Sequence, residues 1–211
     1  SLELGGTAGF CGQLKLSDRL YATTLGDALA VVDVGRARER VLFERYLRLL
    51  GNNATVSQQL LFPERIELSP ADGRLMAEIR EELSSLGFEF SANGPAGVTA
   101  ENGPADNKGA GEGVTYEITG IPPELPAGMV QDALHEAIAR VRELGGVPES
   151  EKVRDLAAIL ARCGASGAAK IDEAAVAPLL DELASCNEPA FTPSGRAVLI
   201  RITREELTKR F

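Results

Sequence analysis

The sequence predicts an α+β fold in two lobes: a sheet-and-helix lobe built from both ends of the chain, and a helix-rich external lobe inserted between them. Two observations predict this arrangement. Apolar strand-like runs lie near both ends, at 28–32 and 197–202, whereas helical spacing of apolar residues dominates the middle. We therefore expect residues 1–64 and 152–211 to form the first lobe and residues 65–151 to form the inserted one.

The first lobe is expected to begin with a β-hairpin followed by a helix. In RLYATTLGDALAVVD (19–33), two β-favouring runs flank the turn signal Gly26-Asp27. The second run is continuously apolar, so we expect a strand that is covered on both faces. A helix should follow from about residue 35 to residue 50, with Arg40 and Glu44 paired on its outer face.

Two later helices carry clear starting signals. Ser69-Pro70 predicts a helix with serine as the cap and proline in the first turn, and Thr203-x-x-Glu206 predicts a capping box. Residues 93–113 are rich in Gly, Ala, Pro and Asn. This composition predicts a long flexible loop, and no G-x-x-x-x-G-K-[ST] spacing supports a nucleotide-binding loop. The run 197–202 predicts a second, mostly buried strand.

Composition favours binding to protein partners or small ligands. The chain has 211 residues and a net charge of −9, whereas proteins that bind DNA tightly on their own usually carry a basic excess. The Arg-rich stretch 36–48 remains a candidate for a local basic patch. No apolar run is long enough for a bilayer and no secretion signal is present, so we expect a cytoplasmic protein without a membrane partner.

Cysteine and histidine are too few and too dispersed for a structural metal site. Cys11, Cys163 and Cys186 lie far apart and are odd in number, which supports neither a disulfide framework nor a zinc site. The single histidine, His135, lies in a helical pattern, and we expect it to have a structural role.

Eight short strings follow one another along nearly the whole chain. They are VVDVGRARERVLFE, QQLLFP, ELSPAD, LGFEF, GIPPEL, LARCGASGAAK, FTPSGR and EELTKRF. In this order they resemble the C-terminal dimerisation domain of bacterial MutL-type DNA mismatch repair proteins. The resemblance implies that residues 1–64 and 152–211 form a homodimerisation lobe and that residues 65–151 form an external, regulatory lobe.

The resemblance also implies what the full-length protein does. Two ATPase-bearing chains would be held together so that ATP binding closes a ring around DNA. ATP and Mg²⁺ are expected only for an N-terminal ATPase domain absent from this chain, so no cofactor is expected here. The implied partners are a second copy, the sliding clamp, other mismatch repair proteins and, only for the full-length protein, mismatched DNA.

Many members of this family nick DNA with a motif of the form D-Q-H-A-x-x-E-x-x-x-x-E and a late C-P-H motif, whose side chains bind metal ions. The resemblance places Asp33, Glu39 and Glu44 at the three acidic positions. Gly35 stands where the family has histidine and has no side chain to donate. Arg36, where the family has alanine, would oppose a bound cation.

The late motif differs as well. Thr192 and Ser194 stand at its cysteine and histidine positions and offer neutral hydroxyls, which are poor ligands for zinc-like metals. We therefore expect no catalytic residue, no metal and no enzyme activity in this domain. The acidic positions are then vestigial, with Asp33 capping the helix that follows it and Glu39 paired with Arg36 or Arg38. A metal-dependent nicking endonuclease of the same family remains an alternative, as does an unrelated soluble protein-interaction module.

The string QQLLFP has the form Q-x-x-[LI]-x-P that this family uses to bind the sliding clamp. Gln58 would provide a hydrogen-bonding amide, Leu61 and Phe62 would be apolar anchors, and Pro63 would hold the segment extended. The resemblance therefore implies weak clamp binding. The alternative is that residues 60–62 simply enter the core.

Overall fold

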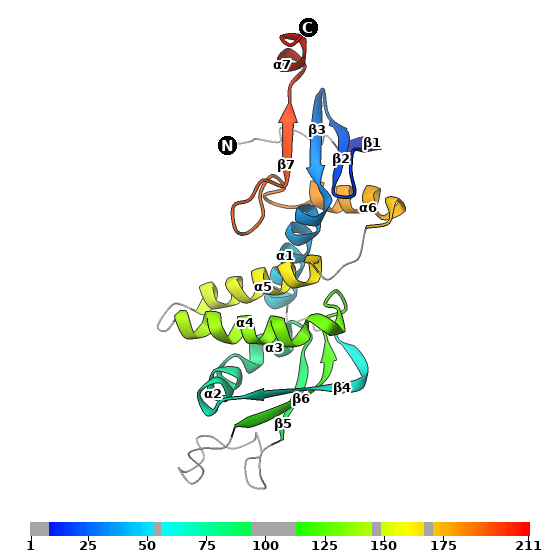
Figure 1. The fold of residues 1–211 in the computed structure, drawn as a ribbon. Coiled ribbons are helices and arrows are strands. Elements are labelled where there is room, and N and C mark those ends of the chain that lie inside the picture. The colour runs from blue at the N-terminus through cyan, green and yellow to red at the C-terminus, as the bar shows by residue number, and fades with distance from the viewer. Residues whose placement is uncertain (1–8, 53–55, 94–112, 145–148, 167–170) are drawn as a thin grey trace. The chain divides into compact units, whose positions relative to one another are not determined.

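The protein has an α+β fold with two antiparallel sheets, as the computed structural model shows (Figure 1). The structure describes residues 9–52, 56–93, 113–144, 149–166 and 171–211. The chain divides into two compact units: the terminal unit, Ser1–Arg45 with Gly164–Phe211, and the central unit, Tyr46–Cys163. The loop predicted at 93–113 lies outside the described residues, except for the residue at each of its ends.

A four-stranded antiparallel sheet of order β1-β2-β3-β7 is the framework of the terminal unit. Its strands are β1 (Phe10–Lys15), β2 (Leu20–Leu25), β3 (Ala28–Asp33) and β7 (Leu199–Ile202). The predicted hairpin is confirmed. Gly26 in its turn has a φ of 62°, a left-handed conformation that glycine adopts without a steric penalty. Because β7 pairs with β3, one sheet contains strands from both ends of the chain.

Helices pack against one face of this sheet. They are α1 (Val34–Asn52), which runs on into the central unit, and α6 (Glu173–Ala184). The core between helices and sheet contains Tyr21, Val32, Val34, Ala37, Val41, Val176, Leu180, Leu183, Val198 and Leu199. Burial of each large apolar side chain contributes about 1.5–3 kcal/mol. This core therefore joins the early and the late segments of the chain.

The opposite face of the sheet is less covered than the sequence predicts. In β3, Val32 is fully buried, whereas its neighbour Val31 is only half-buried, so the prediction of a strand covered on both faces is wrong. The run 197–202 is not mostly buried either, because Ile200 is 55% exposed. The physical reason is that β7 is an edge strand and that the core forms on a single face.

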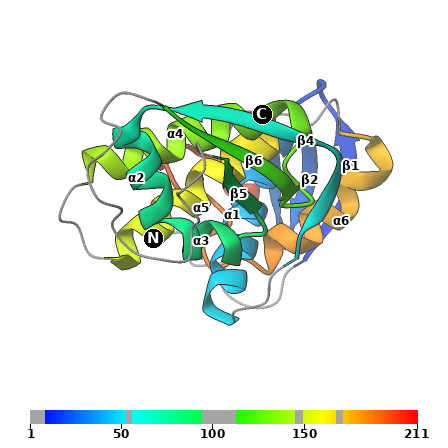
Figure 2. The same ribbon diagram turned by 90° about the horizontal axis from the view of Figure 1, so that it is seen from below.

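The central unit contains a three-stranded antiparallel sheet of order β4-β6-β5 (Figure 2). Its strands are β4 (Gln58–Leu68), β5 (Glu89–Asn93) and β6 (Val114–Ile121). Its helices are α2 (Pro70–Glu78), α3 (Arg80–Ser85), the short 3-10 helix η1 (Ala127–Met129), α4 (Val130–Glu143) and most of α5 (Glu149–Ser166). Ion pairs of Arg140 with Asp155 and of Arg162 with Glu136 link α4 to α5, and their order along the chain shows that the two helices run antiparallel.

Both predicted helix starts are confirmed. Ser69 caps α2, and its Oγ accepts the backbone N–H of Asp72 at 3.2 Å. Thr203 and Glu206 make both hydrogen bonds of the capping box that opens α7 (Arg204–Thr208). The backbone N–H of Thr203 donates to the Glu206 carboxylate and lowers the pKa of Glu206 below its usual value. Within the described part of the chain, no helix is long and apolar enough to cross a membrane.

Candidate functional site

The three acidic positions of the nuclease motif lie together in the terminal unit. Asp33 is the last residue of β3, and Glu39 and Glu44 lie on α1. The segment between α6 and β7, residues 185–198, comes from the other end of the chain and contacts this part of α1 through Arg196, Glu188 and Asn187. The geometry of the site therefore depends on contacts between distant segments.

Asp33 has the capping role that the sequence predicts. Its Oδ1 accepts the backbone N–H of Arg36 at 3.1 Å, which satisfies a free donor in the first turn of α1. Its Oδ2 lies 3.0 Å from Nη2 of Arg19 and 3.6 Å from Nε of Arg36. A side chain at Gly35 would begin 3.4 Å from Oδ1 of Asp33. Position 35 thus lies beside the carboxylate of Asp33, but glycine offers no side chain there.

Glu39 is buried and pairs with an arginine that the sequence did not suggest. Its Oε2 lies 2.7 Å from Nη2 of Arg196, so the predicted pairing with Arg36 or Arg38 is wrong. Arg36 instead donates from Nη1 to the carbonyl of Ala197 at 2.8 Å. No local spacing could reveal the partner, because Arg196 is 157 positions away from Glu39.

The Arg40–Glu44 pair forms as predicted, but it is buried and does not lie on an outer face. Arg40 is 3% exposed and Glu44 is 8% exposed, and Nη2 of Arg40 lies 2.8 Å from Oε1 of Glu44. Both oxygens of Glu44 also accept the backbone N–H of Asn187 at 2.9 Å. The segment after α6 therefore covers this face of α1, which the helical spacing alone could not indicate.

Thr192 and Ser194, the residues at the late motif positions, are brought close to Glu39 by Arg196. Their hydroxyl oxygens lie 3.0 Å apart. Oγ1 of Thr192 accepts the backbone N–H of Arg196 at 3.1 Å, and Oγ of Ser194 accepts from Nε of Arg196 at 3.3 Å. These hydroxyls thus orient the guanidinium that pairs with Glu39.

This donor set does not fit a zinc-like metal centre. Each motif carboxylate is already paired with a guanidinium: Asp33 with Arg19, Glu39 with Arg196 and Glu44 with Arg40. A divalent cation would have to displace these charges and would find neither thiolate nor imidazole at the motif positions. Across the described ranges, no group of three or more His, Cys, Asp or Glu residues could hold a metal ion.

None of the cysteines falls at a motif position, and neither does the histidine. Cys163 is buried, which raises the pKa of its thiol, and all three cysteines are free. His135 is exposed on α4 in the central unit, where its Nδ1 lies 2.9 Å from the carbonyl oxygen of Gln131. This contact lies within one helix.

In the segment Gln58–Pro63, the two glutamines pair with β6 and the next four residues leave the ladder. Gln59 pairs with Gly120 and Glu64 with Ile118, so four residues of β4 stand opposite a single residue of β6. This irregularity leaves Leu61 94% exposed and Phe62 85% exposed. The alternative that these two side chains enter the core is therefore wrong.

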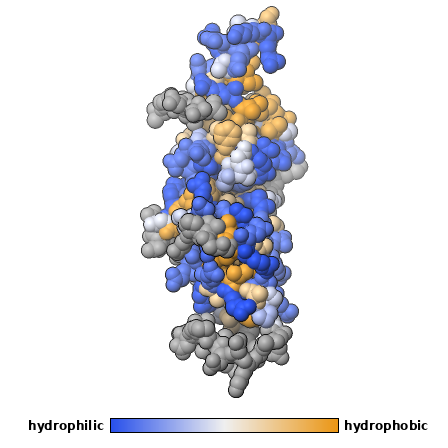
Figure 3. All heavy atoms as spheres, turned by 90° about the vertical axis from the view of Figure 1, so that its left-hand side faces the viewer, coloured by the Kyte–Doolittle hydropathy of each residue, from blue (hydrophilic) through white to orange (hydrophobic). Residues whose placement is uncertain are grey.

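The uncovered face of the terminal sheet carries an apolar row. Strand pairing aligns Leu14, Ala22, Val31 and Ile200 across all four strands. Leu14 is 65% exposed and Ile200 is 55% exposed, and Figure 3 shows hydrophobic atoms at the surface of this unit on the β7 side. In β2, β3 and β7, the only charged residue that pairing places on this face is Asp33.

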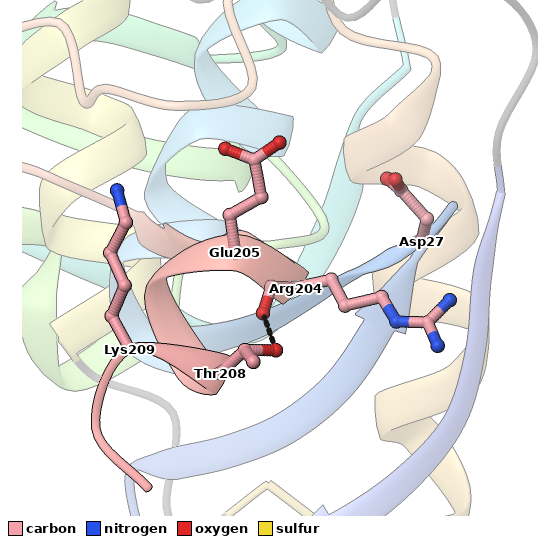
Figure 4. Close-up of a pocket in the computed structure, with 5 residues that line it drawn as sticks. All are labelled: Asp27, Arg204, Glu205, Thr208 and Lys209. Atoms are coloured by element: carbon pink, nitrogen blue, oxygen red, sulfur yellow. Dashed lines mark hydrogen bonds between the residues drawn. The ribbon is translucent and has the colours of Figure 1, made fainter.

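A separate groove of about 500 Å³ lies at the tip of the β2–β3 hairpin. It is lined by Asp27, Arg204, Glu205, Thr208 and Lys209, and Figure 4 shows that these side chains do not converge on one point. Their charges are of mixed sign. The groove therefore offers no obvious catalytic or metal-binding arrangement.

Comparisons with known proteins identify the family of this chain. The MutL C-terminal dimerisation domain family matches residues 16–171, and the chain belongs to this family, as its sequence strings suggested. It is 31% identical over 205 residues to the DNA mismatch repair protein MutL of Bacteroides fragilis, and this match covers 94% of the chain and 29% of that relative.

Other relatives match in the same way. The MutL protein of Parabacteroides distasonis is 31% identical over 206 residues, which cover 95% of the chain and 30% of that protein. For the MutL protein of Pelodictyon phaeoclathratiforme the identity is 29% over 198 residues, covering 93% of the chain and 29% of the relative. The chain thus spans less than a third of the length of these relatives.

The buried Arg40–Glu44 pair generates a stability prediction. Arg40→Ala should lower the free energy of unfolding by about 3 kcal/mol, because it removes a buried guanidinium that pairs with the buried carboxylate of Glu44. Urea denaturation measures this change. Lys15→Ala, which removes the exposed ion pair with Asp18, is the control and should change the free energy by less than about 1 kcal/mol. Equal losses in the two variants would contradict the importance of the buried pair.

Proposed function

We propose that this chain is the C-terminal homodimerisation part of a MutL-type mismatch repair protein. The family match and the names of the relatives support this assignment. In the full-length protein, the domain would hold two chains together, and their N-terminal ATPase domains would close around DNA when ATP binds. The assignment of residues 1–64 and 152–211 to a dimerisation lobe, and of 65–151 to an external lobe, is part of this proposal.

The observation that carries the proposal is the apolar row on the uncovered face of the terminal sheet. This row crosses four strands and consists of Leu14, Ala22, Val31 and Ile200. It is a contiguous apolar surface of the kind that marks protein interfaces. A second copy could cover it by an isologous two-fold contact, in which the same surface is used by both chains. Backbone pairing within the sheet keeps this surface rigid before association.

We also propose that the domain lacks endonuclease activity. The supporting observation is that guanidinium groups neutralise all three motif carboxylates, while Gly35, Thr192 and Ser194 replace the family's soft ligands. Hydrolysis of a phosphodiester by this family's chemistry needs metal ions to activate water and to stabilise negative charge. A separate nuclease would then have to cut the strand.

Weak binding to the sliding clamp is the third part of the proposal. A peptide that docks in a groove needs accessible anchors, and Leu61 and Phe62 are almost fully exposed on the part of β4 that leaves the ladder. Gln58, at the start of β4, is exposed as well. Pro63 restricts the backbone and so reduces the entropy lost on binding.

Dimerisation can be tested with Ile200→Asp. A two-fold interface would bury this charge twice, so the dimer should weaken by at least about thirtyfold, equivalent to about 2 kcal/mol. Light scattering over a concentration series measures the change. Leu61→Asp, an equally polar change on an exposed side chain of the central unit, should leave the dimer intact. A wild-type chain that stays monomeric at high concentration would refute the proposal.

Nuclease activity can be tested on supercoiled plasmid with Mn²⁺. The wild-type chain and Asp33→Asn should both give only the background rate of nicking, because the carboxylates are paired with arginines and the soft ligands are missing. Agarose gel electrophoresis measures the nicked fraction. Robust wild-type nicking that Asp33→Asn abolishes would show that a metal-dependent endonuclease is present.

Clamp binding can be tested with the double variant Gln58→Ala and Leu61→Ala. It should weaken binding to the clamp by about tenfold or more, because it removes the amide and an apolar anchor. The fold should be unaffected, since both residues are exposed. Surface plasmon resonance on immobilised clamp gives the affinity. The matched control is Glu67→Ala, because Glu67 is exposed on the same strand. Equal affinities of the wild type and the double variant for the clamp would exclude a role of this segment in clamp binding.

A further inference from the structure

The two outer strands of the central sheet meet across a glycine of the middle strand. Gln59 of β4 pairs with Gly120 of β6, and Glu89 of β5 pairs with the same glycine. Because Gly120 has no side chain, the side chains on either side of it reach each other, and Nε2 of Gln59 donates to Oε2 of Glu89 at 2.7 Å. This contact, the Gln59–Glu89 bridge, links two strands that β6 otherwise keeps apart (Figure 2).

The bridge depends on glycine at position 120. A Cβ at this position would begin 3.0 Å from Cβ of Glu89 and 2.4 Å from Oγ of Ser57. Even alanine would therefore push these neighbours aside. Glycine is suited to this position because side chains of the neighbouring segments approach its backbone closely.

Both ladders of β6 shift register just beyond this row. Thr119, which precedes Gly120 in β6, is paired in neither ladder. Its Oγ1 donates to the carbonyl of Glu89 at 3.3 Å, which adds a second link between β6 and β5. The Gln59–Glu89 bridge thus lies at the last regular level of the sheet before residues 60–63 leave the ladder.

Residues 60–63 are held unequally at their two ends. After them, residues 64–68 all pair with β6, whereas before them only two residues of β4 do. A ladder of two pairs opens more easily than a ladder of five, because fewer backbone hydrogen bonds must break. The Gln59–Glu89 bridge ties this short ladder to a third strand, so it restricts the path of the exposed residues that follow.

The two glutamines of this segment have different surroundings. Successive side chains of a strand point to opposite faces, so Gln58 and Gln59 face in opposite directions. The amide of Gln59 is engaged by Glu89 within the sheet. Gln58 is exposed and is available to a partner protein. One glutamine therefore serves the fold, and the other remains for recognition.

We infer that Gln59 and Glu89 are positioning residues for clamp binding: their bridge over Gly120 holds residues 60–63 in place, and neither side chain contacts the clamp. This inference rests on the proposed clamp binding. A segment that is held before association loses less conformational entropy on binding, so the bridge raises the affinity. A single exposed hydrogen bond corresponds to about a threefold to tenfold change in affinity.

Surface plasmon resonance of the 211-residue chain on immobilised clamp tests this role. Glu89→Ala should weaken binding about threefold to tenfold, because it breaks the bridge. Glu89→Gln retains an oxygen that accepts from Gln59 and should bind within about twofold of wild type. Glu67→Ala, which also removes an exposed carboxylate of the central sheet, is the charge-matched control and should bind like wild type.

Two further measurements separate positioning from direct contact. In a double-mutant cycle, adding Gln59→Ala to Glu89→Ala should cause no further loss of affinity, because the bridge is already broken. Hydrogen exchange of the free chain should be faster in Glu89→Ala at the backbone amides of residues 58–62, whereas residues 64–68 should exchange as in wild type.

The possible results distinguish this inference from the proposed clamp binding. If the wild-type chain binds the clamp, three results would overturn the inference alone: unchanged affinity in Glu89→Ala, equal losses in Glu89→Ala and Glu67→Ala, or a further loss when Gln59→Ala is added. Unchanged hydrogen exchange in Glu89→Ala would do the same. A wild-type chain that does not bind the clamp would refute the proposed clamp binding and this inference with it.

Discussion

The terminal unit depends on the buried carboxylate of Glu44. It accepts the backbone N–H of Asn187, a residue 143 positions further along the chain, and it pairs with the buried guanidinium of Arg40. A carboxylate that is buried without partners costs free energy, because it loses its hydration. Here the charge of Arg40 and the hydrogen bonds from the backbone compensate that loss. This interaction fixes the segment after α6 on α1, and the same segment leads into β7, which completes the sheet.

The other two acids of the motif are paired in the same way as Glu44. A carboxylate at a strand end or on a helix needs a positive partner when it is partly buried, and a metal ion or an arginine can provide that charge. Here Asp33, Glu39 and Glu44 all have arginine partners. Each of the three acids therefore has a structural role in the terminal unit through its arginine partner.

Exposed apolar groups occur where strands lack a neighbour or leave their register. In the terminal unit, α1 and α6 cover one face of the sheet, and the row containing Ile200 is left open on the other. In the central unit, the irregular pairing of β4 and β6 pushes Leu61 and Phe62 outward. Ladder pairing holds β7 on β3 and holds β4 on β6 on both sides of the irregular part, so both surfaces are available for recognition without a large ordering penalty.

Local sequence signals are sufficient for much of this protein. The turn at Gly26, the caps at Ser69 and Thr203 and the role of Asp33 at the start of α1 depend on residues within a few positions of one another. They could be read correctly because short-range hydrogen bonds and backbone preferences determine them. The family resemblance, too, comes from the order of short strings.

The partners of buried charges and the exposure of the strands were decided by contacts between distant segments. Arg196 meets Glu39, and Asn187 meets Glu44, only because β7 pairs with β3 and carries the preceding segment onto α1. Likewise, an apolar run such as 197–202 has the same pattern in a central strand as in an edge strand. Which groups lose their water depends on what packs above them, and spacing along a single segment carries no information about that.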